Sequence, residues 1–153
     1  MPKRNATAAV IGAGDYIGAE IVKKFAAEGF TVFAGRRNGE KLEPLVKEVE
    51  AAGGTIYGRS LDARKEEETT AFLNDADKHA PLEVCIFNVG ANVNFPILET
   101  TDRVFRKVWE MACWAGFVAG RECNERTRDL EIPGLVLAHH PGMTAEGVDN
   151  AKA

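Results

Sequence analysis

Short apolar runs alternate along the chain with segments whose apolar residues recur at helical spacing. The apolar runs, rich in β-branched and aromatic residues, predict strands over roughly residues 6–12, 30–34, 55–61, 82–88 and 134–138. The amphipathic segments predict helices over roughly residues 17–28, 39–52, 62–80 and 101–126. This alternation indicates an α/β fold. We expect a Rossmann-like, doubly wound parallel sheet of four to five strands, with helices on both faces.

Glycine, proline and aspartate mark several of the expected helix ends. Gly29 follows the first helix as a C′ glycine would, and Gly53 closes the second. Pro44 falls near the first turns of the second helix, where proline is tolerated. Asp15 is a candidate N-cap for the first helix.

Composition and charge narrow the class of protein. The 153 residues predict one globular unit, with 45% hydrophobic and 27% charged residues. A net charge of −4 gives no electrostatic case for nucleic acid or an anionic membrane, and no apolar run approaches the ~20 residues of a membrane span. The N-terminus has no signal-peptide pattern, so a cytoplasmic location is expected. Cys85, Cys113 and Cys123 form no C-x-x-C pair and are expected to be reduced thiols.

A glycine pattern stands between the first predicted strand and the first predicted helix. Gly12, Gly14 and Gly18 would let the backbone turn sharply and approach a pyrophosphate, which the helix N-terminus would attract. The spacing differs from G-x-G-x-x-G, because Ile17 stands where that pattern has its third glycine. A tight turn without a ligand is the alternative. The charge of Asp15 is expected to face away from any phosphate.

Two arginines follow the second predicted strand. In doubly wound folds this position lies beside the adenosine ribose, where an acidic residue favours NAD. Arg36 and Arg37 instead suit a 2′-phosphate, since the guanidinium pairs bidentately with phosphate. We therefore expect NADP rather than NAD as the cofactor. A solvated basic loop is the alternative.

These motifs together resemble the short-chain dehydrogenase/reductase superfamily over residues 6 to about 122. The turn over 12–18 is similar to the family's nucleotide turn, Asp62-Ala63 to its adenine-contacting acid, and Asn88-Val89-Gly90 to its structural Asn-x-Gly motif. The resemblance implies NAD(P)-dependent conversion between an alcohol and a carbonyl group. The cofactor site that it implies consists of Gly12, Gly14, Tyr16, Ile17, Gly18, Arg36, Arg37, Asp62, Ala63, Asn88, Val89 and Gly90.

The chain also departs from the family. Tyr16 stands where the middle glycine of the turn would be, and the family's helix asparagine is replaced by Cys113, expected to be a packing residue. The family's catalytic tyrosine has a lysine four residues on, but neither Tyr16 nor Tyr57 does. We therefore predict no catalytic residue and no metal ligand. The expected organisation is a nucleotide-binding domain over 1–122 and a divergent tail over 123–153, as in a truncated or altered family member.

Three functions remain open from the sequence. The first is an NADP-binding oxidoreductase by descent that is catalytically incomplete, and the second is a non-catalytic NADP-binding regulatory module. The third is a self-associating scaffold, because the helix over 101–126 is apolar on more than one face. That helix is the expected surface of a homodimer, unless the tail folds back over it.

Overall fold

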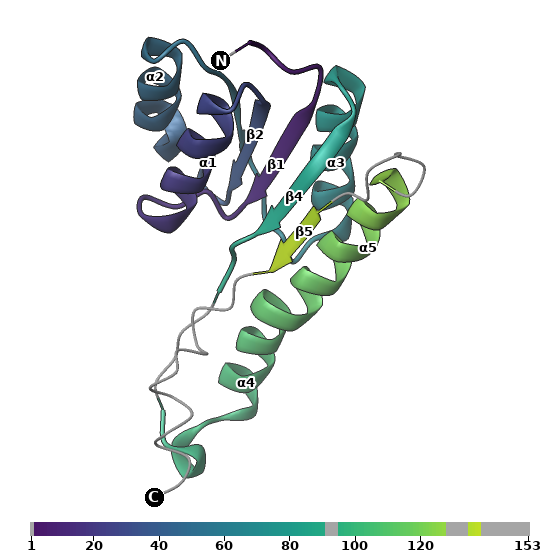
Figure 1. The fold of residues 1–153 in the computed structure, drawn as a ribbon. Coiled ribbons are helices and arrows are strands. Elements are labelled where there is room, and N and C mark those ends of the chain that lie inside the picture. Colours follow the sequence, from purple (N-terminus) through teal and green to yellow (C-terminus); the bar gives the residue numbers. More distant parts are fainter. Residues whose placement is uncertain (1, 91–94, 128–134, 139–153) are drawn as a thin grey trace, which may run out of the picture.

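A five-stranded parallel sheet forms the centre of the protein (Figure 1). The structure is a computed structural model, and it describes residues 2–90, 95–127 and 135–138. The strands are β1 (Thr7–Ile11), β2 (Thr31–Arg36), β3 (Thr55–Ser60), β4 (Leu82–Phe87) and β5 (Leu135–Ala138). They lie in the order β3-β2-β1-β4-β5, and every neighbouring pair is parallel. The predicted parallel sheet is confirmed.

Helices cover both faces of this sheet, as Figure 1 shows. The helical segments are α1 (Ile17–Ala27), η1 (Gly39–Leu42), α2 (Glu43–Ala51), α3 (Glu66–His79), η2 (Ile97–Glu99), α4 (Asp102–Trp109), η3 (Glu110–Trp114) and α5 (Ala115–Thr127). Helices α1 and α2 pack on one face, and α3 and α5 pack on the other. The chain therefore winds outward in both directions from β1. The doubly wound Rossmann-like fold is confirmed.

Two apolar layers hold the helices to the sheet. Val10 of β1 points into the layer that contains Val22 of α1, and Ile11 points into the opposite layer with Leu73 of α3. All five residues of β1 are buried. A central strand covered on both faces favours apolar residues along its length, and β1 is apolar after Thr7, whose buried hydroxyl donates to the carbonyl of Ala80.

The third helix starts later than the sequence predicts. The expected start is residue 62, but α3 begins at Glu66. The carboxylate of Asp62 accepts hydrogen bonds from the backbone N–H and the guanidinium of Arg64, and the N–H of Lys65 donates to the carbonyl of Asp62. Aspartate often binds nearby backbone in this way, and the resulting turn competes with helix.

The expected N-cap of α1 is wrong. Tyr16 occupies the N-cap position without a side-chain cap bond, and the carboxylate of Asp15 instead accepts a hydrogen bond from Arg36. Other expected helix ends are confirmed. Gly29 follows α1 at φ +89°, and Pro44 lies in the first turn of α2.

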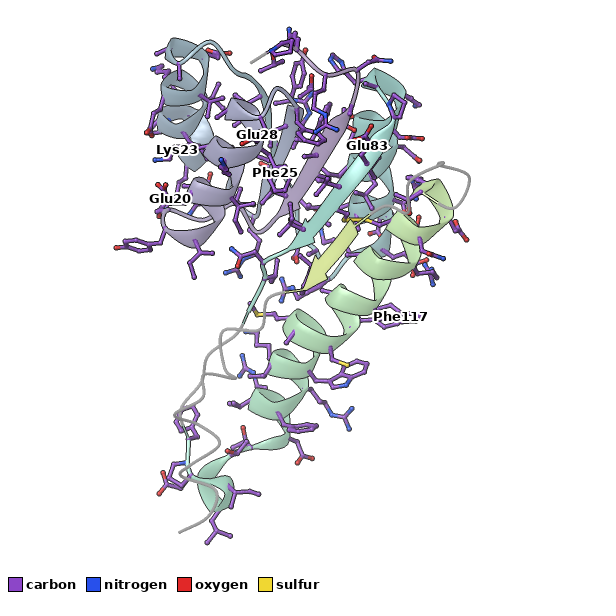
Figure 2. All side chains as sticks on the ribbon, viewed as in Figure 1. Glu20, Lys23, Phe25, Glu28, Glu83 and Phe117 are labelled. Carbon is purple, nitrogen blue, oxygen red and sulfur yellow. A yellow bond between two sulfur atoms is a disulfide. The ribbon has the colours of Figure 1, made fainter. Side chains whose placement is uncertain are left out.

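The long helix predicted over 101–126 is interrupted. Helices α4 and α5 are joined by a π-helical segment, η3, and the three run on as one rod that extends past the sheet (Figure 1). Phe105, Trp109 and Phe117 are exposed on it, and Figure 2 shows Phe117 pointing away from the sheet. Cys113 is also exposed, so its expected role as a packing residue is wrong. Cys113 lies within the π-helical segment η3.

A disulfide links β4 to α5. Cys85 and Cys123 are buried in the same apolar layer, their Cα atoms are 6.4 Å apart, and their sulfur atoms are bonded (Figure 2). The expectation that all three cysteines are reduced is therefore wrong for this pair. None of the helices in the described ranges is both long and apolar enough to span a bilayer. Of the predicted tail, residues 128–134 and 139–153 lie outside the described residues.

Candidate functional site

A pocket of about 270 Å³ lies at the carboxyl ends of the strands, beside β1 and β4. The chain turns to opposite faces of the sheet after these two strands, and ligands of doubly wound folds bind at such a switch point. All of the predicted site residues except Tyr16, Ile17 and Gly18 line this pocket. The lining residues are Ile11, Gly12, Gly14, Arg36, Arg37, Leu61, Asp62, Ala63, Arg64, Asn88, Val89, Gly90 and Met111.

The three glycines of the turn serve two purposes. A Cβ on Gly12 would lie 2.5 Å from the carbonyl oxygen of Asn88, and a Cβ on Gly18 would lie 2.5 Å from the carbonyl oxygen of Gly12. Both glycines therefore permit close backbone packing within the protein. A Cβ on Gly14 would meet nothing within 4 Å. The backbone at Gly14 borders open pocket, so a glycine here suits the close approach of a ligand.

Asn88 connects the end of β4 to the glycine turn. Its side-chain amide donates to the carbonyl of Gly12 at 3.1 Å, and its backbone N–H donates to the carbonyl of Ile11 at 2.8 Å. The backbone N–H of Gly12 donates in turn to the carbonyl of Gly35 on β2. These bonds connect the carboxyl ends of β4, β1 and β2, the strands beside which the pocket lies.

Two arginines stand at the end of β2, but their surroundings differ. The Nη1 of Arg36 lies 2.6 Å from a carboxylate oxygen of Asp15, whereas Arg37 is exposed and has no ion-pair partner among the described residues. The hydrogen bond from Arg36 lowers the pKa of the Asp15 carboxyl, and the charge of Lys41 contributes. The carboxylate of Asp15 is thus ionised and directed at Arg36.

The residues after β3 form a second charged corner of the pocket. The carboxylate of Asp62 receives two hydrogen bonds from the Arg64 guanidinium, at 2.9 Å and 2.5 Å. These bonds lower the pKa of Asp62 despite its partial burial. The indole N–H of Trp114 donates to the backbone carbonyl of Arg64 at 3.2 Å, so η3 is tied to this corner. Met111, also on η3, lines the pocket.

The remaining predicted residues lie beside the pocket, not in its lining. Tyr16 and Ile17 are exposed at the start of α1, with 85% and 53% of their surface accessible, and Gly18 is buried beneath the turn. Sequence reasoning missed Arg64 and Met111. Arg64 follows Asp62 by two residues and could have been found from that spacing. Met111 comes from a distant π segment and had no local signal.

The arrangement combines features that suit a dinucleotide. The turn exposes backbone to the pocket, α1 directs its N-terminus toward the turn, and cationic side chains border the pocket from the ends of β2 and β3. The unpaired N–H groups at a helix N-terminus bind anions. In the described part of the chain, no group of three or more His, Cys, Asp and Glu side chains is arranged to hold a metal ion.

Comparison with known proteins identifies the family. The sequence model of the short chain dehydrogenase family matches residues 6–126. The crystal structure of a short-chain dehydrogenase from Rhodopseudomonas palustris is 84% identical with a TM-score of 0.79, over 80% of this chain and 58% of that one. A variant of actinorhodin polyketide ketoreductase, solved with NADPH, is 27% identical with a TM-score of 0.76, over 81% of this chain and 49% of that one.

A curated relative gives the same result. The galactitol 2-dehydrogenase (L-tagatose-forming) of Cereibacter sphaeroides is 32% identical over 121 residues, which are 76% of this chain and 46% of that enzyme. The chain spans about half the length of the curated relatives it matches. The matched region includes the glycine turn, the arginines after β2 and the Asn-x-Gly segment after β4. The protein belongs to the short-chain dehydrogenase/reductase family.

Proposed function

We propose that this chain binds a nicotinamide adenine dinucleotide in the pocket beside β1 and β4, and that it prefers NADP(H) to NAD(H). The observation that carries this proposal is the meeting of three features in one pocket: a glycine turn open at Gly14, and Arg36 and Arg37 at the end of β2. A 2′-phosphate needs cations at this place, and guanidinium groups pair with phosphate bidentately.

Each part of the site has a role in this proposal. The open backbone at Gly14 and the N-terminus of α1 would take the pyrophosphate, and the arginines would take the 2′-phosphate. Asp62 and Ala63 would lie against the adenine, as the family resemblance implies. Asn88 would keep the turn in place through its bond to Gly12. When bound, the nicotinamide supplies a carbon that accepts or donates hydride.

We further propose that these 153 residues do not carry out hydride transfer by themselves. The family reaction uses a tyrosine whose proton transfer is assisted by a lysine four residues on. Tyr16 is followed at that distance by Glu20, and Tyr57 by Leu61. Neither tyrosine lines the pocket. Nucleotide binding without turnover is the function that these residues support.

A second candidate function is self-association through the rod formed by α4, η3 and α5. Phe105, Trp109 and Phe117 are exposed on this rod, with about half or more of their surface accessible. Exposed apolar side chains grouped on one element often mark a protein contact. We propose a homodimer through this rod as an assembly compatible with nucleotide binding.

The proposal is tested by titrating the protein with NADPH and with NADH in a calorimeter. We expect NADPH to bind about tenfold more tightly or better, because a charge-assisted, bidentate hydrogen bond contributes about 1.5–3 kcal/mol. Arg36→Ala should remove most of this preference while leaving NADH binding nearly unchanged. Lys78→Ala, at an exposed cation of α3 outside the pocket and outside the rod, is the control.

The outcomes separate the candidate functions. Equal binding of the two nucleotides would contradict the preference for NADP(H). No binding of either nucleotide, together with stable self-association in light scattering, would favour the scaffold function. Oxidation of NADPH in the presence of simple ketones would contradict the proposed lack of turnover.

Gly14→Ala should weaken nucleotide binding without lowering the stability of the fold. The added methyl meets no protein atom within 4 Å, and Gly14 is not among the glycines with positive φ, so unfolding in urea should be unchanged or slightly harder. The same methyl projects where the pyrophosphate would approach, so NADPH affinity should fall about tenfold or more. Gly120→Ala in α5, also free of neighbours, is the control. Unchanged NADPH affinity in Gly14→Ala would place the pyrophosphate elsewhere.

A further inference from the structure

We infer that Asp15 is a specificity-determining residue, which weakens the preference of this site for 2′-phosphorylated nucleotides by acting as the counter-ion of Arg36. The inference rests on the proposed nucleotide site and adds to it a residue outside the predicted cofactor contacts. One of the two arginines that line the pocket at the end of β2, Arg36, already has an anionic partner.

Asp15 is the more exposed and less constrained partner of the pair. The side chain of Arg36 is 19% exposed, whereas the side chain of Asp15 is 69% exposed. The bond to Arg36 is the one side-chain hydrogen bond of Asp15 among the described residues. Asp15 does not cap α1, because Tyr16 occupies the N-cap position. Among the described residues, displacing this carboxylate therefore breaks no other side-chain hydrogen bond, although it weakens the attraction of Asp15 to the charge of Lys41.

Arg36 stands at the border of two adjoining hollows. It lines the nucleotide pocket together with Gly14 and Arg37, and it also lines a hollow of about 210 Å³ together with Asp15 and Lys41. A phosphate on the 2′-oxygen of the ribose would approach Arg36 from the nucleotide pocket, while Asp15 approaches it from the other hollow. The two anions would compete for one guanidinium.

Competition of this kind acts on one class of nucleotide. A 2′-phosphate carries a charge of about −1.5 to −2 at neutral pH, so the carboxylate of Asp15 would repel it. The phosphate would also find some of the N–H donors of Arg36 already bound to Asp15. A nucleotide with a free 2′-hydroxyl has no charge at that place and would meet neither effect. Asp15 would therefore narrow the gap in affinity between the two classes, while Arg37 and Lys41 continue to attract the phosphate.

The test compares two small probes that differ at the 2′ position, 2′,5′-ADP and 5′-AMP, by calorimetry. Asp15→Asn should bind 2′,5′-ADP on the order of fivefold more tightly, since exposed ion pairs and screened charges each contribute modestly. Binding of 5′-AMP should change less than twofold. Asp75→Asn, an exposed aspartate on α3 outside both hollows, removes the same charge and should change neither affinity.

A double-mutant cycle assigns the effect to Arg36. When Arg36 is already replaced by Ala, Asp15→Asn should raise the affinity for 2′,5′-ADP by a smaller factor. The substitution then removes only the direct repulsion between Asp15 and the 2′-phosphate. Asp15→Ser is the second variant, to be used if Asp15→Asn does not fold, as judged by its unfolding curve.

Three results would overturn the inference. Weaker binding of 2′,5′-ADP to Asp15→Asn would mean that Asp15 orients Arg36 for the phosphate. An equal gain in affinity for 2′,5′-ADP and 5′-AMP would mean that Asp15 acts on any anionic nucleotide and not on the 2′-phosphate. An unchanged ratio of affinities in a protein that binds NADPH would remove the role of Asp15 and leave the proposed function intact. If neither the wild type nor Asp15→Asn binds NADPH or either probe, the proposed function itself fails.

Discussion

Gly12→Ala is expected to lower the free energy of unfolding by about 3 kcal/mol or more. Gly12 has φ +92°, a conformation that costs other residues about 1–2 kcal/mol. Its added Cβ would also lie 2.5 Å from the carbonyl oxygen of Asn88, so β4 would have to move, and such overpacking costs about 1–3 kcal/mol. Chemical denaturation followed by circular dichroism measures the change.

Gly53→Ala is the matched control for this prediction. Gly53 has a similar φ of +82°, but a Cβ there would meet nothing within 4 Å. Gly53→Ala should lower the free energy of unfolding only by the conformational cost of a positive φ, about 1–2 kcal/mol. Equal losses at the two positions would show that the contact between the glycine turn and β4 is not tight. A larger loss at Gly12 would establish that the turn and the end of β4 are packed as one unit.

Reduction of the disulfide between Cys85 and Cys123 is expected to lower the free energy of unfolding by about 2–4 kcal/mol. The bond closes a loop across a sequence separation of 38 residues, and closing a loop of this length restricts the unfolded chain by an amount in that range. The bond also joins β4, which leads into Asn88, to α5, which follows the segment that carries Met111. Denaturation with and without a reducing agent measures the difference.

A count of thiols provides the independent check. The unreduced, denatured protein should react with one equivalent of a thiol reagent, at Cys113, which is exposed in the folded structure. Cys113→Ser should react with none and should keep the stability of the parent protein. Three equivalents per chain would contradict the disulfide and return the two buried cysteines to the role of apolar packing residues.

The sequence predicted much of the site because parallel strands bring their carboxyl ends to one edge. Residues that directly follow β1, β2, β3 and β4 must then lie close together, whatever the details of packing. Gly14, Arg36, Asp62 and Asn88 were found in this way, and the structure gathers them in one pocket. That they bind a nucleotide remains a prediction.

Errors arose where a side chain has more than one partner within reach. Asp15 suits the N-cap of the following helix, but Arg36, which is 21 residues away, takes its carboxylate. Asp62 could have begun a helix, yet its bonds to Arg64 form a turn and delay α3 until Glu66. Local patterns predict which bonds a residue can make, and the fold selects among them.

The sequence by itself determined the order of strands and helices, the parallel sheet, the turn between β1 and α1 and the family. These features follow from hydrophobic spacing and from glycine and proline positions, which act over a few residues. The tertiary structure alone decided that Arg36 is paired with Asp15, that Cys85 is bonded to Cys123, and that Gly14 faces open pocket while Gly12 packs on β4. Each of these depends on distances between atoms far apart in the chain, and only the folded backbone sets those distances.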